Sequence, residues 1–259
     1  MSVTTAPPGR GTAPPSPSPR FYHPTVARLT YGALLGRRRA LLLFCLPLLL
    51  LVISAAVRAL SGADDSTADD VLQGFALSAL VPLVGVIAGT GAIGPEIDEG
   101  AIVYLLAKPV RRSTIILTKL VVAVGVSLAF TAVPVLLAGY ILNSNGQNVA
   151  VAYTVGSAVA CVAYSAIFLL LGVVTRHAVV VGLVYALVWE GAVANVVPGA
   201  RKLSVQQWAL AVAQKVAHGD IVSSDVGLTA GVVLLAVVTV VTTWFAARRL
   251  RSLKLAAEE

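Results

Sequence analysis

The side chains that most often carry out catalysis are few and scattered in this sequence. The three histidines, His23, His177 and His218, lie in different connections between apolar segments. Both cysteines, Cys45 and Cys161, lie within apolar segments and are expected to pack as small hydrophobic residues. The sequence contains no Gly-x4-Gly-Lys-Ser/Thr phosphate loop, no Gly-x-Ser-x-Gly and no His-Glu-x-x-His motif. We therefore predict that the chain is not an enzyme and holds no metal or cofactor of its own.

A group of charged side chains lies in the segment 95–113. Pro95 suits the first turn of a helix, and the carboxylates that follow it would complement the positive helix end. An apolar run too short to span a membrane separates this acidic start from a basic end. The pattern predicts a short helix at a membrane face, which either is a structural surface element or docks into a partner protein. Its charged and turn-forming residues are Glu96, Asp98, Glu99, Gly100, Lys108, Pro109, Arg111 and Arg112.

Glu190 is the one carboxylate inside a predicted membrane span, next to Trp189. An ionisable residue in a span is a candidate for function because burying its charge is costly. On that basis Glu190 is a candidate for lining a substrate pathway. The alternative, which we favour, is that the span bends outward early and leaves Glu190 at the wet outer interface, with Trp189 in the aromatic belt.

The composition places most of the chain in lipid. Of its 259 residues, 58% are apolar and 12% are charged, about half the roughly 25% that a soluble domain carries. This excludes a soluble enzyme, a secreted disulfide scaffold and a disordered chain. The net charge of +7 is distributed as expected for contact with a membrane surface and not with nucleic acid.

Six apolar stretches are long enough to cross a membrane. A hydrocarbon core of about 30 Å needs roughly 20 helical residues at about 1.5 Å each. Lys119, near the start of the third stretch, is expected within reach of water. The predicted spans are about 41–60, 71–94, 114–142, 150–174, 178–197 and 226–247.

The connections between these spans alternate in charge. Of the 19 Lys and Arg residues, all but four fall before the first span, near the second and fourth connections, or after the last span. The 61–70 connection carries four aspartates and no basic residue, and the 143–149 connection carries no charge. Because Lys and Arg accumulate on the cytoplasmic side, the pattern predicts an all-α integral membrane protein with six transmembrane helices and both termini in the cytoplasm.

Three further segments flank or connect the spans. Residues 1–23 are rich in proline and polar residues and are predicted to be a disordered cytoplasmic tail. In 24–39, Val26, Leu29, Leu34 and Leu35 are expected to share one face of an interfacial helix, although a simple basic flank of the first span is equally consistent. In 198–225, apolar residues recur at helical spacing, which predicts an amphipathic helix on the outer leaflet anchored by Trp208.

The segment 95–119 resembles the first cytoplasmic loop of type-2 ATP-binding-cassette (ABC-2) transporter permeases. The resemblance rests on the string Glu96-x3-Gly100, an apolar run, then Lys108-Pro109-Val110-Arg111-Arg112 and Lys119. The start of the chain, with Leu35-Gly36-Arg37-Arg38-Arg39 before the first span, is similar to that of such permeases, and the layout agrees over almost the whole chain. Ala101 departs from the Thr or Ser that commonly follows the glycine.

The resemblance implies that residues 24–259 form the transmembrane permease domain of an exporter in the cytoplasmic membrane. In that family the first cytoplasmic loop is a coupling helix that contacts an ATPase subunit, which implies a coupling role for Glu96, Asp98, Glu99, Gly100, Pro109, Arg111 and Arg112. ATP and Mg²⁺ would be bound by that separate subunit. A second copy of the chain, or a similar permease, would be needed to enclose a pathway, and membrane lipid is a further partner.

The exporter has two alternatives. One is a six-span accessory or assembly protein that does not transport. The other is an ion-coupled secondary transporter, which the sequence disfavours because the predicted spans lack the charged relay that such transporters need. The sequence does not indicate the substrate. Arg outnumbers Lys 14 to 5, and Ala and Val dominate, which indicates a bacterial source.

The topology predicts which loops react from outside the cell. Single cysteines placed in the 61–70 and 143–149 connections should react with a membrane-impermeant maleimide in intact cells, because these loops lack positive charge. Cysteines in 95–113 should react only after the membrane is permeabilised. Labelling of 95–113 in intact cells would contradict the whole topology.

Overall fold

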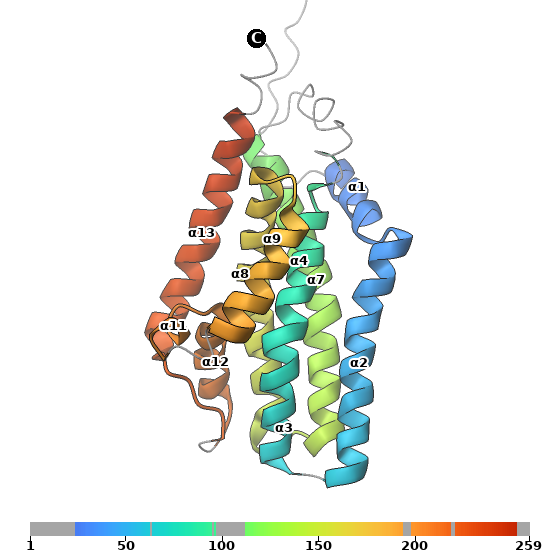
Figure 1. The fold of residues 1–259 in the computed structure, drawn as a ribbon, viewed down its shortest axis with the longest axis vertical. Coiled ribbons are helices and arrows are strands. Elements are labelled where there is room, and N and C mark those ends of the chain that lie inside the picture. The colour runs from blue at the N-terminus through green and yellow to red at the C-terminus, as the bar shows by residue number, and fades with distance from the viewer. Residues whose placement is uncertain are drawn as a thin grey trace, which may run out of the picture.

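The computed structural model describes residues 24–62, 64–94, 96, 112–193, 198–218 and 221–252. All elements in these ranges are helices (Figure 1). In η1 and η3 the hydrogen-bond ladder is π-helical, and η2 is a 3₁₀ turn. In chain order the elements are α1 (Pro24–Leu34), α2 (Arg37–Ser61), α3 (Asp65–Val71), η1 (Leu72–Leu80), α4 (Val81–Gly91), α7 (Arg112–Asn143), η2 (Gly146–Asn148), α8 (Val149–Val174), α9 (Ala178–Val184), η3 (Tyr185–Val193), α11 (Pro198–Arg201), α12 (Val205–Val216) and α13 (Leu228–Ser252).

Five helices in the described ranges are long and apolar enough to cross a membrane: Arg39–Ser61, Asp65–Gly91, Ser113–Asn143, Gly146–Val174 and Leu228–Leu250. They lie where the first four spans and the sixth were predicted. The predicted fifth span, 178–197, is a shorter apolar helix over Ala178–Ala192, and residues 194–197 lie outside the described ranges. The all-α prediction is confirmed, and five of the six predicted spans have the length of a full crossing.

The long helices run in alternating directions along one bundle. In Figure 1, α1, the start of α7 and the end of α13 lie together at the upper end, and α3 lies at the lower end. We call these the basic end and the acidic end of the bundle, because the connections there carry most of the Lys and Arg residues and four aspartates, respectively. The predicted tail, 1–23, lies outside the described residues.

The 61–70 connection is shorter than predicted, because most of it is helical. Asp64 is the N-cap of α3, and its carboxylate accepts hydrogen bonds from the Ser66 hydroxyl and from the Thr67 amide and hydroxyl. Aspartate is a preferred N-cap because its side chain satisfies amides that have no partner in the helix. The same hydrogen bonds, led by that from Ser66, lower the pKa of Asp64 below its ordinary value. The second span is thereby extended to Asp65 at its start.

Helix α8 is the centre of the bundle, with α4, α7, α12 and α13 packed around it. Gly85 and Gly89 of α4 face Tyr164 and Phe168 of α8, and a Cβ at Gly89 would lie 2.6 Å from the Phe168 Cβ. Glycine at such a position lets two helix backbones approach closely, which provides van der Waals contact where lipid offers no hydrophobic driving force. The Gly-x3-Gly pattern of the second span therefore has a definite partner in α8.

Helix α12 does not lie on the outer surface as the sequence predicted. It packs along α8 and α13, and most of its apolar residues are buried together with Gln206 and Gln207, with Trp208 only 5% exposed. Close approach is again made by small residues, because a Cβ at Gly156 or Gly231 would lie 3.1 Å from a backbone carbonyl oxygen of α12. The Trp208 indole donates to the Lys202 carbonyl (2.8 Å), so it is held within the protein and does not anchor a lipid interface.

Helix α1 exists where an interfacial helix was predicted, but its faces differ from the expectation. Val26 and Leu34 are buried against the bundle, whereas Leu29 and Leu35 are exposed. The Thr30 hydroxyl can be buried on this face because it donates a hydrogen bond to the Val26 carbonyl within the same helix. The buried face therefore includes a threonine that hydrophobicity alone does not select.

The turn between α7 and α8 is bonded to the segment that follows α12. Four residues that are not glycine adopt positive φ there: Ser144, Asn145, Gln147 and Asn148. The Gln147 carbonyl accepts the His218 amide (2.8 Å), and the Asn148 side-chain amide lies 2.7 Å from the His218 imidazole Nδ1. These two contacts fix the α7–α8 turn to a residue 70 positions further along the chain.

The glycine packing leads to a stability prediction. Gly89→Ala should lower the thermal unfolding temperature in detergent, since the new methyl group overlaps α8, at a cost of about 1–3 kcal/mol for overpacking. Gly74→Ala, in the same span, is the matched control because a Cβ there meets nothing within 4 Å. Equal losses in both variants would mean that the α4–α8 contact is not the cause.

Candidate functional site

A buried ion pair lies at the basic end of the bundle, where α4 ends and α7 begins. The Lys119 ammonium of α7 is 2.7 Å from Glu96 Oε1 and 2.5 Å from the carbonyl oxygen of Ala92. The Lys119 side chain is 0% exposed and that of Glu96 is 17% exposed. The expectation that Lys119 lies within reach of water is therefore wrong. Its charge is neutralised by a carboxylate and a backbone carbonyl, as a buried cation requires.

This ion pair marks both sides of the segment 97–111, which is not among the described residues. Glu96 is the last described residue before that segment, and Arg112 opens α7 directly after it. Asp98, Glu99, Gly100, Pro109 and Arg111 fall within the segment, so their coupling role stays a prediction. The structure does place Glu96, whose carboxylate is directed inward to α7.

A second contact holds the end of α4 from the opposite side. Arg39, in the first turn of α2, donates from Nη1 to the carbonyl oxygen of Gly91 at 3.2 Å. Carbonyls at a helix end have no partner within the helix, so a basic side chain is favourable there. Arg39 and Lys119 thus donate to two successive carbonyl oxygens at the end of the second span, those of Gly91 and Ala92. A displacement of Glu96 would act directly on Lys119 of α7 and, through Lys119, on the Ala92 carbonyl at the end of α4.

Glu190 is fully buried in the fifth apolar helix, at 0% exposure, so the interpretation that it lies at a wet interface is wrong. Its Oε1 accepts from the Val205 amide (3.1 Å) and the Tyr185 hydroxyl (3.2 Å), and its Oε2 accepts from the Ser204 hydroxyl. Ser204 is the N-cap of α12 and makes no capping bond of its own. Glu190 therefore supplies that cap from another segment, and this bond holds the start of α12 inside the bundle.

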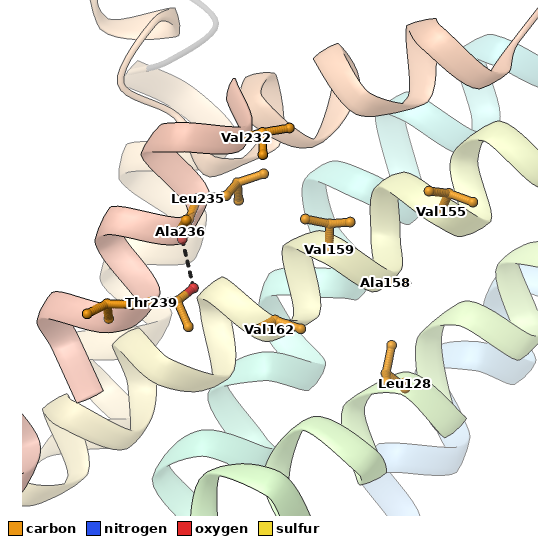
Figure 2. A pocket seen from close by; sticks show the side chains of 10 residues that line it. Leu128, Val155, Ala158, Val159, Val162, Val232, Leu235, Ala236 and Thr239 are labelled. Atoms are coloured by element: carbon orange, nitrogen blue, oxygen red, sulfur yellow. Dashed lines mark hydrogen bonds between the residues drawn. The ribbon is translucent and has the colours of Figure 1, made fainter. Parts of the chain in front are cut away.

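An apolar groove of 560 Å³ lies between α7, α8 and α13 (Figure 2). Among the described residues that line it, Thr239 alone is polar, and its hydroxyl donates to the Leu235 carbonyl (2.8 Å). The groove therefore presents only hydrocarbon surface and fits an alkyl chain or another apolar group. Its lining is Leu128 of α7, four residues of α8 and five of α13: Val155, Ala158, Val159, Val162, Val232, Leu235, Ala236, Thr239 and Val240.

No group of three or more His, Cys, Asp and Glu side chains in the described ranges is placed to hold a metal ion. The polar contacts described above have two roles. The contacts of Lys119 and Arg39 hold the ends of neighbouring helices together, and Glu190 holds the start of α12. The arrangement is suited to transmitting and withstanding movement between helices.

The sequence indicated Glu96 and Glu190 but not the residues that bind them. Lys119 carried a usable signal: a lysine one and a half turns inside a span needs a partner, and Glu96 lies at the same end of the bundle. Ser204 and the Val205 amide carried no such signal, because their pairing with Glu190 depends on how α12 folds back into the bundle.

The comparison with known families agrees with the resemblance noted in the sequence. A family model described as an ABC-2 family transporter protein matches residues 35–249. That range begins two residues before α2 and ends within α13, so it includes the ion pair, Glu190 and the groove. No curated protein matches the chain.

The cap on α12 leads to a prediction about local stability. Glu190→Ala should leave the Ser204 hydroxyl and the Val205 amide buried without an acceptor, at about 1–3 kcal/mol for each group. We expect faster amide hydrogen exchange in peptides covering 204–216, measured by mass spectrometry, with no change in α7. Asp225→Ala is the control, since its contact with Arg201 (3.5 Å) is half exposed. Exchange in 204–216 as slow as in the wild type would contradict the capping role.

Proposed function

Because this chain belongs to the ABC-2 transporter family, we propose that it is the transmembrane permease subunit of an exporter driven by ATP. The match over residues 35–249 is the observation that carries the proposal. The chain is a multi-pass membrane protein, and membrane transport components of this family usually work with an ATPase subunit. We assign ATP and Mg²⁺ to that separate subunit, since this sequence has no phosphate-binding loop.

We further propose six crossings, with both termini in the cytoplasm of a bacterial cell. Ala178–Ala192 rises only about 22 Å at roughly 1.5 Å per residue, which is less than a full bilayer core. The helix directions in Figure 1 nevertheless support a fifth crossing, because α8 ends near the basic end and α13 begins far from it. Six crossings are too few to enclose a pathway, so a second copy or a similar permease would complete it.

The ion pair of Lys119 with Glu96 is the proposed link between ATP hydrolysis and the bundle. In this proposal the segment 97–111 contacts the ATPase through the predicted residues Asp98, Glu99, Gly100, Pro109 and Arg111. Glu96 then passes the displacement to α7 through a contact of 2.7 Å to Lys119, whose side chain is 0% exposed. A pair of this kind is suited to the role because separating it would leave the buried Lys119 charge without its carboxylate, which is costly.

The apolar groove in Figure 2 supports an apolar or amphipathic substrate. Its walls belong to three long helices. Val232 and Val240 line it and are exposed, so we expect the groove to be accessible from the surrounding lipid. Glu190 is a positioning residue in this proposal, because its two oxygens are occupied by Tyr185, Ser204 and Val205.

Purification from native membranes tests the proposal. A tagged chain isolated in mild detergent should carry a second polypeptide with a phosphate-binding loop, identified by mass spectrometry, and the preparation should hydrolyse ATP. The isolated chain alone should not. A chain that inserts normally but brings no ATPase with it would favour the accessory-protein alternative.

The coupling role has its own test in the reconstituted complex. Lys119→Met and Glu96→Gln should still bind the ATPase subunit but change its turnover in proteoliposomes about fivefold or more, the size of a typical coupling energy. Arg201→Gln is the matched control, since its ion pair with Asp225 lies far from the basic end and is 41% and 50% exposed. Wild-type turnover in both variants, with normal gel-filtration profiles, would contradict the proposed link.

A further inference from the structure

A small polar pocket of 180 Å³ lies at the basic end of the bundle, apart from the apolar groove. Four segments form it: the first turn of α2, the end of α4, the end of α8 and the start of α9. Its polar lining consists of Arg39, Thr90, Thr175, Arg176 and His177. Among the described residues no carboxylate lines the pocket, whereas two arginines do, so its described lining is electropositive.

The donors in this pocket are arranged by contacts within the protein. Arg39 uses Nη1 to hold the Gly91 carbonyl, which orients the guanidinium and leaves four of its five N–H groups for other acceptors. Thr175 Oγ1 accepts the His177 amide at 3.3 Å, so the hydroxyl proton is directed away from the turn. Within the described residues, neither Arg39 nor Arg176 forms an ion pair with a carboxylate, and Glu96 is engaged by Lys119.

The pocket lies at the boundary between lipid-facing and polar surface. Val179 and Val180 line the pocket and are 47% and 60% exposed. Val174, next to the lining residue Thr175, is 51% exposed. On the side of α2, the exposed leucines Leu41 and Leu42 lie two and three residues after Arg39. A ligand held by the cationic residues would therefore have hydrocarbon surface directly next to its polar group.

Size restricts the ligand further. A water molecule occupies about 30 Å³ of liquid volume, so the pocket has room for roughly six waters. That suffices for a phosphate group with its ester oxygens, whereas an alkyl chain must lie outside, along the valines. Arginine recognises phosphate through paired N–H donors, and basic pockets between membrane helices bind anionic headgroups.

We propose that this pocket binds the phosphate headgroup of an anionic phospholipid, with Arg39 and Arg176 as its main ligands. The acyl chains lie along the exposed valines of α8 and α9. Bound there, the lipid bridges the starts of α2 and α9 and the end of α4. This site is distinct from the substrate groove and does not depend on the permease role.

Native mass spectrometry of the full chain tests the proposal. Titration with phosphatidylglycerol should give a bound lipid at concentrations where phosphatidylcholine, which has the same phosphate but no net charge, binds much more weakly. Arg176→Gln should weaken phosphatidylglycerol binding about fivefold, the effect of one basic residue at an anionic membrane surface. Arg176→Gln together with His177→Asn should weaken it further.

Arg248→Gln is the matched control. Arg248 is exposed near the end of α13, where its guanidinium lies 3.8 Å from the centre of the Trp244 ring, and it does not line the pocket. Its substitution should leave phosphatidylglycerol binding unchanged. An equal loss in Arg248→Gln would show diffuse charge attraction and overturn the site. Undiminished binding in Arg176→Gln would overturn it as well. Because the Arg176 side chain is exposed, its substitution is not expected to disturb folding, so a loss of binding in this variant reports on the site. If inorganic phosphate protects the chain from thermal unfolding as strongly as phosphatidylglycerol does, the pocket binds a free anion, and the proposal of a lipid site is overturned.

Discussion

Lipid offers no hydrogen bond, so every polar group that these helices bring into the bundle has to be satisfied by the protein itself. The hydroxyl groups of Thr90, Thr118 and Thr131 solve this locally by donating to carbonyls one turn earlier. Charged groups have no local solution. Lys119 is bonded to residues that follow α4, and Glu190 is bonded to the start of α12 besides Tyr185 of its own helix, so both charges are buried only when distant segments are in place. One buried charge therefore ties the end of α4 to α7, and another holds the start of α12.

Small residues determine which helices can meet. Helix α8 accepts α4 on one side through Gly85 and Gly89, and α12 on another through Gly156. By contrast, α2 and α13 present long exposed apolar side chains to their surroundings, such as Leu41, Phe44 and Val240. Tight backbone contact in the centre and loose contact at the periphery suit a bundle whose outer helices move against a stable middle.

Local properties of the sequence predicted most of the fold. Span positions follow from apolar length, and α8 was located within one residue because its ends, Val149 and Val174, adjoin polar turns. The candidate site was predicted less completely, because it depends on contacts between distant segments. Burial of Lys119 depends on Glu96, 23 residues earlier, and burial of Glu190 depends on α12, 14 or 15 residues later. The helical periodicity of α12 was real, but periodicity cannot distinguish a lipid surface from the surfaces of α8 and α13. The same ambiguity explains why Leu29 of α1, and Leu35 directly after it, are exposed.

The uneven distribution of close contacts also determines how the sequence of such a protein diverges. At Gly89 no side chain fits without moving α8, and at Gly156 even a methyl group would push against α12, so we expect little sequence change at these two positions. Lipid-facing positions such as Leu48, Val52 and Val237 need only remain apolar, and they exchange freely among leucine, valine, isoleucine and phenylalanine. Homologues are therefore expected to preserve a sparse register of small residues while their overall identity falls. Relatedness in this fold is then better measured by the spacing of its glycines than by the number of matching residues.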